Sequence, residues 1–129
     1  MSRLRIREGR EDDLEWLDEQ LKEFNKYVAG NGRLYPGQEY CLKALTIMVK
    51  NHFVRVAETE EGQRAGFISA FVAPHPYNPK IKIMSEQFWW VSPIYRKGRA
   101  GLMLMNEFIR WGKKNADWLT FDLFHGSPV

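Results

Sequence analysis

The sequence predicts one α/β (α+β) domain, residues 1–129, in which a mixed and mostly antiparallel sheet is flanked by helices. Three observations predict this class. Two helical stripes of apolar residues occur before residue 51, alternating residues follow from 52 to 91, and a third helical stripe precedes a last strand. The predicted element order is β-α-α-β-β-β-α-β. A length of 129 residues is enough for a single domain and too short for two cores.

The first third of the chain predicts a strand followed by two helices. "LRIREG" alternates apolar and charged residues, with Leu4 and Ile6 on the buried face. "REDD" supplies acids and a capping aspartate where a helix begins, and this helix is expected to reach about residue 28. After the loop "AGNGRLYPG", a second helix is expected over 38–50. The apolar stripes of the two helices are Leu14, Leu17, Leu21, Phe24 and Val28, then Cys41, Ala44, Leu45 and Met48.

The middle of the chain changes to a period of two. "HFVRVAE" and "AGFISAFVA" predict a hairpin around "TEEGQR", and "IKIMSEQFWWV" predicts a long strand after a proline-rich loop. In that strand, strict alternation places Glu86, Phe88 and Trp90 on one face. A helix over 100–115, with an apolar face of Leu104, Met105, Phe108, Ile109 and Trp111, and the strand "DWLTFDLF" follow. A strand, a loop, a helix and another strand predict a crossover with parallel strands.

Composition excludes several classes of protein. A hydrophobic content of 44% supports a real core, and a single cysteine, Cys41, excludes an internal disulfide and a cysteine-based zinc site. The three histidines are too far apart in sequence to form a metal motif, so no metal is expected. We expect a cytoplasmic protein without a membrane span, because no apolar run is long enough. A balance of 19 basic and 16 acidic residues makes nucleic acid an unfavoured partner.

One segment concentrates basic residues and glycines at a predicted helix start. "VSPIYRKGRAG" places Arg96, Lys97 and Arg99 around Gly98 and before Gly101. The first N–H groups of a helix lack partners and carry the positive end of its dipole, so this arrangement is typical of a phosphate-binding loop. A solvated turn with a basic rim is the alternative. The segment matches neither the Walker sequence nor the dinucleotide fingerprint.

These residues resemble motif A of the GNAT superfamily of N-acetyltransferases. That motif reads Arg/Gln-x-x-Gly-x-Gly/Ala after a Val-x-Pro turn, and the segment from 96 to 101 follows it here, between a strand and a helix. The predicted order of elements resembles the first three quarters of the GNAT fold. The resemblance implies that acetyl-CoA is the cofactor and that the acceptor is an amine, either a small molecule or a protein.

The resemblance also implies which residues bind coenzyme A. The backbone amides of 97–102 would hold its pyrophosphate, with charge added by the basic side chains. The backbone of Trp90 and Val91 would bind the pantetheine arm, and the end of the strand at Val91 would supply the N–H that polarises the acetyl carbonyl. The implied cofactor residues are Trp90, Val91, Arg96, Lys97, Gly98, Arg99, Ala100, Gly101 and Leu102.

The sequence departs from the family pattern at two points. Arg99 stands where the family has its first glycine, which is tolerable where φ is negative. After "FHGSPV", the helix and two strands that end the GNAT fold do not follow; that helix often carries the tyrosine that protonates the leaving thiolate. Three explanations are left open: the chain is a fragment of a longer protein, a partner completes the sheet, or the protein does not catalyse. An exposed sheet edge after the last strand would favour pairing with another chain, for example in a homodimer.

Four further residues are candidates for the chemistry. Glu86 lies on the strand leading to the acetyl site, where burial between apolar neighbours could raise its pKa and suit it as a catalytic base; a surface glutamate is the alternative. Phe24 and Tyr35 are assigned to the acceptor pocket by the resemblance alone. His125 follows the last strand and is a candidate for substrate binding, with simple exposure as the alternative.

Two functions therefore compete. The first is an acetyl-CoA-dependent N-acetyltransferase that moves an acetyl group to a primary amine by direct attack. The second is a catalytically inactive GNAT-like protein that acts as a protein-interaction module. The nature of the acceptor is left open by the sequence.

Overall fold

A computed structural model of the chain describes residues 3–27 and 35–121. The described elements follow the predicted order, with short 3₁₀ turns before two of the helices. No helix among them has the length and apolar character that a bilayer crossing requires. The strands and helices, in chain order, are β1 (Leu4–Glu8), α1 (Leu14–Tyr27), α2 (Gln38–Asn51), β2 (Phe53–Thr59), β3 (Arg64–Pro74), β4 (Lys82–Val91), α3 (Ala100–Asn115) and β5 (Trp118–Thr120).

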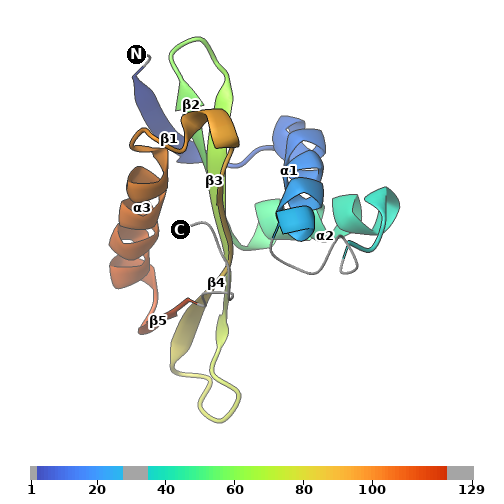
Figure 1. Ribbon diagram of the computed structural model, residues 1–129. Helices are drawn as coiled ribbons and strands as arrows, with labels where there is room; N and C mark the ends of the chain where they lie inside the picture. Colours follow the sequence, from blue (N-terminus) through green and yellow to red (C-terminus); the bar gives the residue numbers. More distant parts are fainter. Residues whose placement is uncertain (1–2, 28–34, 122–129) are drawn as a thin grey trace.

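The five strands form one sheet in the order β1-β2-β3-β4-β5. The first four are antiparallel, and β5 pairs with β4 in parallel, which confirms the predicted crossover through α3. Figure 1 shows α3 on one face of the sheet and α1 with α2 on the other. The predicted fold class is confirmed. The first predicted helix, α1, ends at Tyr27 in the described chain, and Val28 of its predicted apolar stripe lies outside the described residues.

Each face of the sheet carries its own apolar core. The α1/α2 face buries Leu17 and Leu45 against Phe67 and Trp90. The α3 face is packed separately, with alternate residues of the same strands pointing the other way. Its buried residues include Phe53, Ile68, Met84, Leu104 and Phe108. Of the stripe predicted for α3, Ile109 is exposed, because the helix buries Ala100 and Gly112 in line with Leu104 and Phe108.

A β-bulge in β4 changes the predicted face of Glu86. Phe88 pairs with Ser69 whereas Glu86 pairs with Ala70, so Gln87 is an extra residue in the strand. Ala70 is packed in the α3 core, and directly opposed residues share a face of a sheet. Glu86 therefore lies on the α3 face, and Phe88 with Trp90 lies on the α1/α2 face. The predicted common face was wrong because strict alternation does not survive a bulge.

The start of α1 is fixed by buried charges. The Asp13 carboxylate, fully buried, accepts two hydrogen bonds from the Arg7 guanidinium, both at 2.8 Å, and one from Arg64 Nε at 2.7 Å. It also accepts the backbone N–H of Arg10 at 2.7 Å, as the N3 residue of a capping box; the N-cap position itself is Arg10 and not the predicted aspartate. Glu58 extends the cluster by accepting Arg7 Nε at 2.7 Å. The cluster joins β1, β2, β3 and the helix start.

These contacts determine the ionisation of Asp13. Burial alone would raise the pKa of its carboxyl, but hydrogen bonds from Arg7, from Arg64 and from the Arg10 backbone outweigh burial and lower the pKa to about 2. The folded pKa is below the unfolded one. The stabilisation is therefore fully present above about pH 4 and is lost as the pH falls from about 4 toward 2.

We expect Asp13→Asn to lower the free energy of unfolding at pH 7 by about 3 kcal/mol, because it leaves buried cations uncompensated. Denaturant unfolding from pH 7 to pH 2 checks this. The difference from the wild type should shrink below about pH 4, where the wild-type carboxylate also becomes protonated. Glu15→Gln, at an exposed position on α1, is the control. A difference that does not depend on pH would contradict the assigned role of the charge.

Candidate functional site

The outer edge of β4 is open beyond its middle. β5 pairs with β4 only at Ile83, Met84 and Ser85. Among the described residues, no strand pairs with this edge of β4 from Gln87 to Val91. Backbone groups that point to this side are therefore available to a ligand.

The register shows which backbone groups point to the open edge. Ser92 N donates to Ala65 O at 2.9 Å, so this pair is a hydrogen-bonded one and the next pair of that kind is Trp90 with Phe67. Val91 stands between them, and its N–H and C=O point away from β3. Arg96 Nε donates to Val91 O at 2.9 Å from that side, in agreement. Of the two residues whose backbone the resemblance implies for pantetheine binding, Val91 directs its peptide groups to the open edge and Trp90 directs its own to β3.

The start of α3 presents its N–H groups without a side-chain cap. The helix begins at Ala100 after Arg99, whose φ of −101° is an ordinary value for a residue with a side chain. The missing family glycine is thus accommodated without strain. The first N–H groups of a helix have no partner within it, and at the N-cap residue Arg99 there is no side-chain hydrogen bond to them. They are free to bind an anion.

A cavity of about 300 Å³ connects these two features. Trp89, Val91 and Gly101 line it from the strand end and the first turn of α3, together with Leu102 and Met105. The indole Nε1 of Trp89 donates to Gly101 O at 3.1 Å and so ties the strand to the helix start. A Cβ added at Gly101 would lie 3.6 Å from its nearest neighbour, the Val91 side chain, which is an ordinary van der Waals distance. Close packing therefore does not require glycine at this position.

The three predicted cations differ in their surroundings. Arg96 also lines the cavity, and its guanidinium lies 4.5 Å from the centre of the Trp90 ring. Lys97 and Arg99 are exposed and form no ion pair with any other described residue. Their charges are therefore not neutralised within the described chain, which suits them to an anionic ligand.

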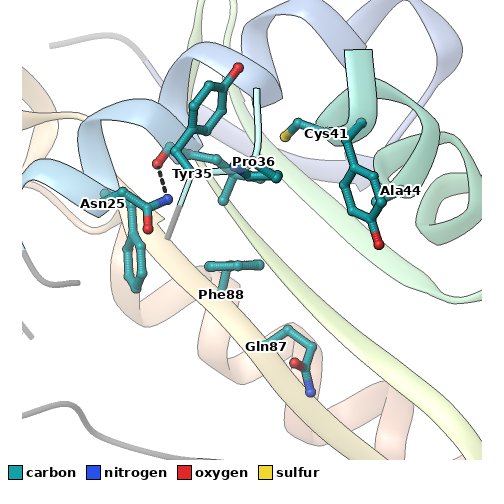
Figure 2. A pocket seen from close by; sticks show the side chains of 10 residues that line it. Asn25, Tyr35, Pro36, Cys41, Ala44, Gln87 and Phe88 are labelled. Atoms are coloured by element: carbon teal, nitrogen blue, oxygen red, sulfur yellow. Dashed lines mark hydrogen bonds between the residues drawn. The ribbon is translucent and has the colours of Figure 1, made fainter. Parts of the chain in front are cut away.

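A second pocket, also of about 300 Å³, lies on the α1/α2 face beside the bulge (Figure 2). Phe24 and Tyr35, which the resemblance assigns to an acceptor pocket, both line it. Gln87 and Phe88 of β4 form its wall toward the sheet. The candidate His125 lies outside the described residues.

A buried carboxylate behind this pocket was missed by the sequence analysis. Asp18 is fully buried, its Oδ1 accepts the hydroxyl of Tyr35 at 2.6 Å, and its Oδ2 lies 3.8 Å from Lys22 Nζ. Burial and the hydrogen bond to Asp18 raise the pKa of Tyr35. Asp18 follows Leu17 on an amphipathic helix, where an acidic residue is expected on the solvent-exposed face. Its hydrogen-bond partner is 17 residues away, so no local pattern predicts the contact.

Helix α1 is also tied to the end of β4. The Gln20 Oε1 atom accepts the indole N–H of Trp90 at 2.9 Å and the hydroxyl of Ser92 at 3.1 Å. Sequence spacing of about 70 residues gives no signal for this contact. It fixes the strand end, where Val91 lies, against the helix that carries the pocket.

Glu86 is buried, 8% exposed, and lies across the sheet from the second pocket. No three His, Cys, Asp or Glu side chains come together as a metal site in residues 3–27 and 35–121.

Comparison with solved structures identifies the fold. A possible acetyltransferase from Clostridium difficile 630 superposes with a TM-score of 0.78 at 16% identity, over 93% of this chain and 79% of that one. A GNAT family acetyltransferase from Staphylococcus aureus gives 0.69 at 16% identity, over 100% and 92%. An aminoglycoside acetyltransferase from a soil metagenome, in complex with sisomicin, gives 0.69 at 17%, over 93% and 77%.

The chain therefore has the GNAT fold, as the order of its elements predicted. No protein-family model matches the sequence, and no curated protein matches it either. At these identities the likeness concerns the fold, so the chemistry has to be argued from the residues themselves.

The single cysteine of the chain, Cys41, supplies a test of the second pocket. Burial, followed by the effect of nearby Asp18, raises the pKa of its thiol to about 12. We expect alkylation by iodoacetamide at pH 8 to be about 10³-fold slower than for an ordinary thiol, because so little thiolate is present. Mass spectrometry over time checks this. Unfolding in urea should restore the ordinary rate, and fast labelling of the folded protein would contradict the buried position.

Proposed function

We propose that the protein is an acetyl-CoA-dependent N-acetyltransferase that transfers the acetyl group directly to a primary amine. Three features around β4 carry this proposal. These are the start of α3 without a side-chain cap, the end of β4 where the N–H of Val91 points away from β3 and its C=O accepts Arg96 Nε, and the pocket beside the β4 bulge. They offer sites for an anion, an acyl group and an acceptor, in that order.

The residues present fit coenzyme A. Its diphosphate needs N–H donors and cations, and the first turn of α3 with Lys97 and Arg99 supplies both. Its amide-bearing arm needs a strand edge, and the edge groups of Val91 are of the right kind. The cavity between these features, bounded by Trp89 and Gly101, leaves room for the connecting part.

The chemistry is a transfer of an acyl group from sulfur to nitrogen. When bound, acetyl-CoA supplies an acetyl group held as a reactive thioester. The C–S bond breaks as the C–N bond forms, and the amine loses one proton while the thiolate gains one. The N–H of Val91 is fixed in the sheet and points to the open edge, where it stabilises negative charge on the acyl oxygen.

The base that takes the amine proton is proposed to be Glu86. It is the carboxylate of β4, it is buried, and it lies beside the bulge. Its position across the sheet means that the proton reaches it around the edge of β4, through water. It acts at a distance from the amine, not by direct contact.

Filling the cavity at the start of α3 tests the cofactor site. We expect Gly101→Leu to weaken CoA binding at least tenfold, because the new side chain occupies the space between Trp89 and Val91 without a backbone clash. Calorimetry with CoA measures the effect, and Ile94→Ala, at an exposed position outside the cavity, is the control. No CoA binding by the wild-type protein would overturn the proposed function.

Removing the charge of Glu86 tests the base. We expect Glu86→Gln to lower kcat by about 10²-fold with CoA binding unchanged, since general bases contribute factors of this size. Initial rates of CoA release from pH 6 to pH 9 check this, and rates should recover in part at high pH, where the free amine is more abundant. Unchanged kcat would remove Glu86 from the mechanism. Loss of CoA binding would show a structural role instead.

A further inference from the structure

The pocket beside the bulge is built almost entirely from apolar surface. α1 contributes Leu21 and Phe24, α2 contributes Cys41 and Ala44, and Phe88 closes the side toward the sheet. Figure 2 shows these side chains, with Tyr35 and Pro36, arranged around the hollow. Its volume of about 300 Å³ is at the small end for ligand sites, so it suits a small molecule.

The polar side chains that line the pocket carry no charge, and two of them are amides, Asn25 and Gln87. The amide nitrogen of Asn25 donates to Leu21 O at 2.7 Å, and that of Gln87 donates to Ser85 O at 3.3 Å. Each amide thus uses one of its two N–H donors on the backbone, and its oxygen can accept a hydrogen bond. No carboxylate is among the described lining residues. Behind the pocket, Asp18 Oδ1 accepts the Tyr35 hydroxyl, and Oδ2 lies 3.8 Å from Lys22 Nζ without a hydrogen-bond partner in the described chain.

We propose that the acceptor is a small primary amine carried on a single apolar alkyl or arylalkyl group. This inference rests on the proposed function and specifies its substrate class. An apolar wall favours such a group by about fourfold for each methylene removed from water. A second ammonium or a set of hydroxyls would lose its hydration there without gaining a charged partner.

The same wall helps the reaction. Transfer from water to an apolar pocket disfavours the charged form of an amine, and so favours the neutral form that attacks a thioester. The two amide oxygens can accept the N–H hydrogens of that neutral amine and orient its lone pair. The pocket thus selects the ligand and increases its reactive fraction.

A panel of amines of matched length tests the substrate class. Hexylamine and 2-(2-aminoethoxy)ethanol have the same charge and chain length but differ in apolar surface. We expect hexylamine and 2-phenylethylamine to show KM values at least about tenfold lower than the ether amine. Spermidine should be poorer still. Equal KM values across the panel, or a lysine peptide at least tenfold better than hexylamine, would overturn the proposal.

A variant at the pocket wall reverses the expected preference. Ala44 is exposed on α2 and lines the pocket, so Ala44→Glu should fold and add the missing carboxylate. Ala44→Glu should raise the KM for 2-phenylethylamine and lower the KM for spermidine, whereas the matched Ala44→Gln should not lower the KM for spermidine. If the glutamate variant leaves the ranking of amines unchanged, the pocket does not bind the acceptor and the inference fails.

Direct binding separates this inference from the proposed function. Calorimetry with hexylamine and with the ether amine, in the presence and absence of CoA, measures amine binding independently of turnover. Binding of hexylamine, weakened by Ala44→Glu, supports the pocket even if CoA fails to bind and acetyl transfer is absent. If acetyl groups are transferred to the ether amine or to spermidine with no preference for apolar amines, the proposed acetyltransferase activity is supported. The assignment of this pocket to an apolar amine is then rejected.

Discussion

The bulge at Gln87 determines the arrangement of everything around the site. One extra residue in β4 reverses which residues face each helix layer, so Phe88 packs under α1 and α2 whereas Glu86 lies under α3. It also reverses which peptide groups pair with β3. With unbroken alternation from Met84, the groups of Trp90 would point outward; with the bulge, those of Val91 do. Ligand contacts, pocket walls and the position of the carboxylate all follow from that single insertion.

The connections around β4 keep this arrangement in place. Gly66 lies opposite Val91, and a Cβ there would stand 2.6 Å from Trp90 O, so only glycine permits β3 to approach so closely. Gln20 holds the Trp90 indole from the α1 side, and Trp89 holds Gly101 from the α3 side. The end of β4 is thus fixed by both helix layers, which gives a ligand a preformed edge.

The sequence predicted the parts of this structure that depend on local pattern. The period of apolar residues located the helices and strands, and the segment that resembles motif A lies at the start of α3, as predicted. The parallel crossover through α3 was also predicted, but irregular pairing and contacts between side chains far apart in sequence were not. Glu86 was placed on the wrong face because a bulge depends on the partner strand, and the Asp18–Tyr35 hydrogen bond needs the tertiary fold. Phe24 and Tyr35 were assigned to the pocket by resemblance, and both line it.

The charge cluster at Asp13 has a consequence at the opposite end of α1. The helix is anchored to the sheet at its first turn, and the pocket residues Leu21 and Phe24 lie two to three turns further along, about 12 to 16 Å away at 1.5 Å per residue. Gln20 adds a second anchor, because its side chain accepts the Trp90 indole N–H. Polar contacts that do not line the pocket therefore position the part of α1 that does.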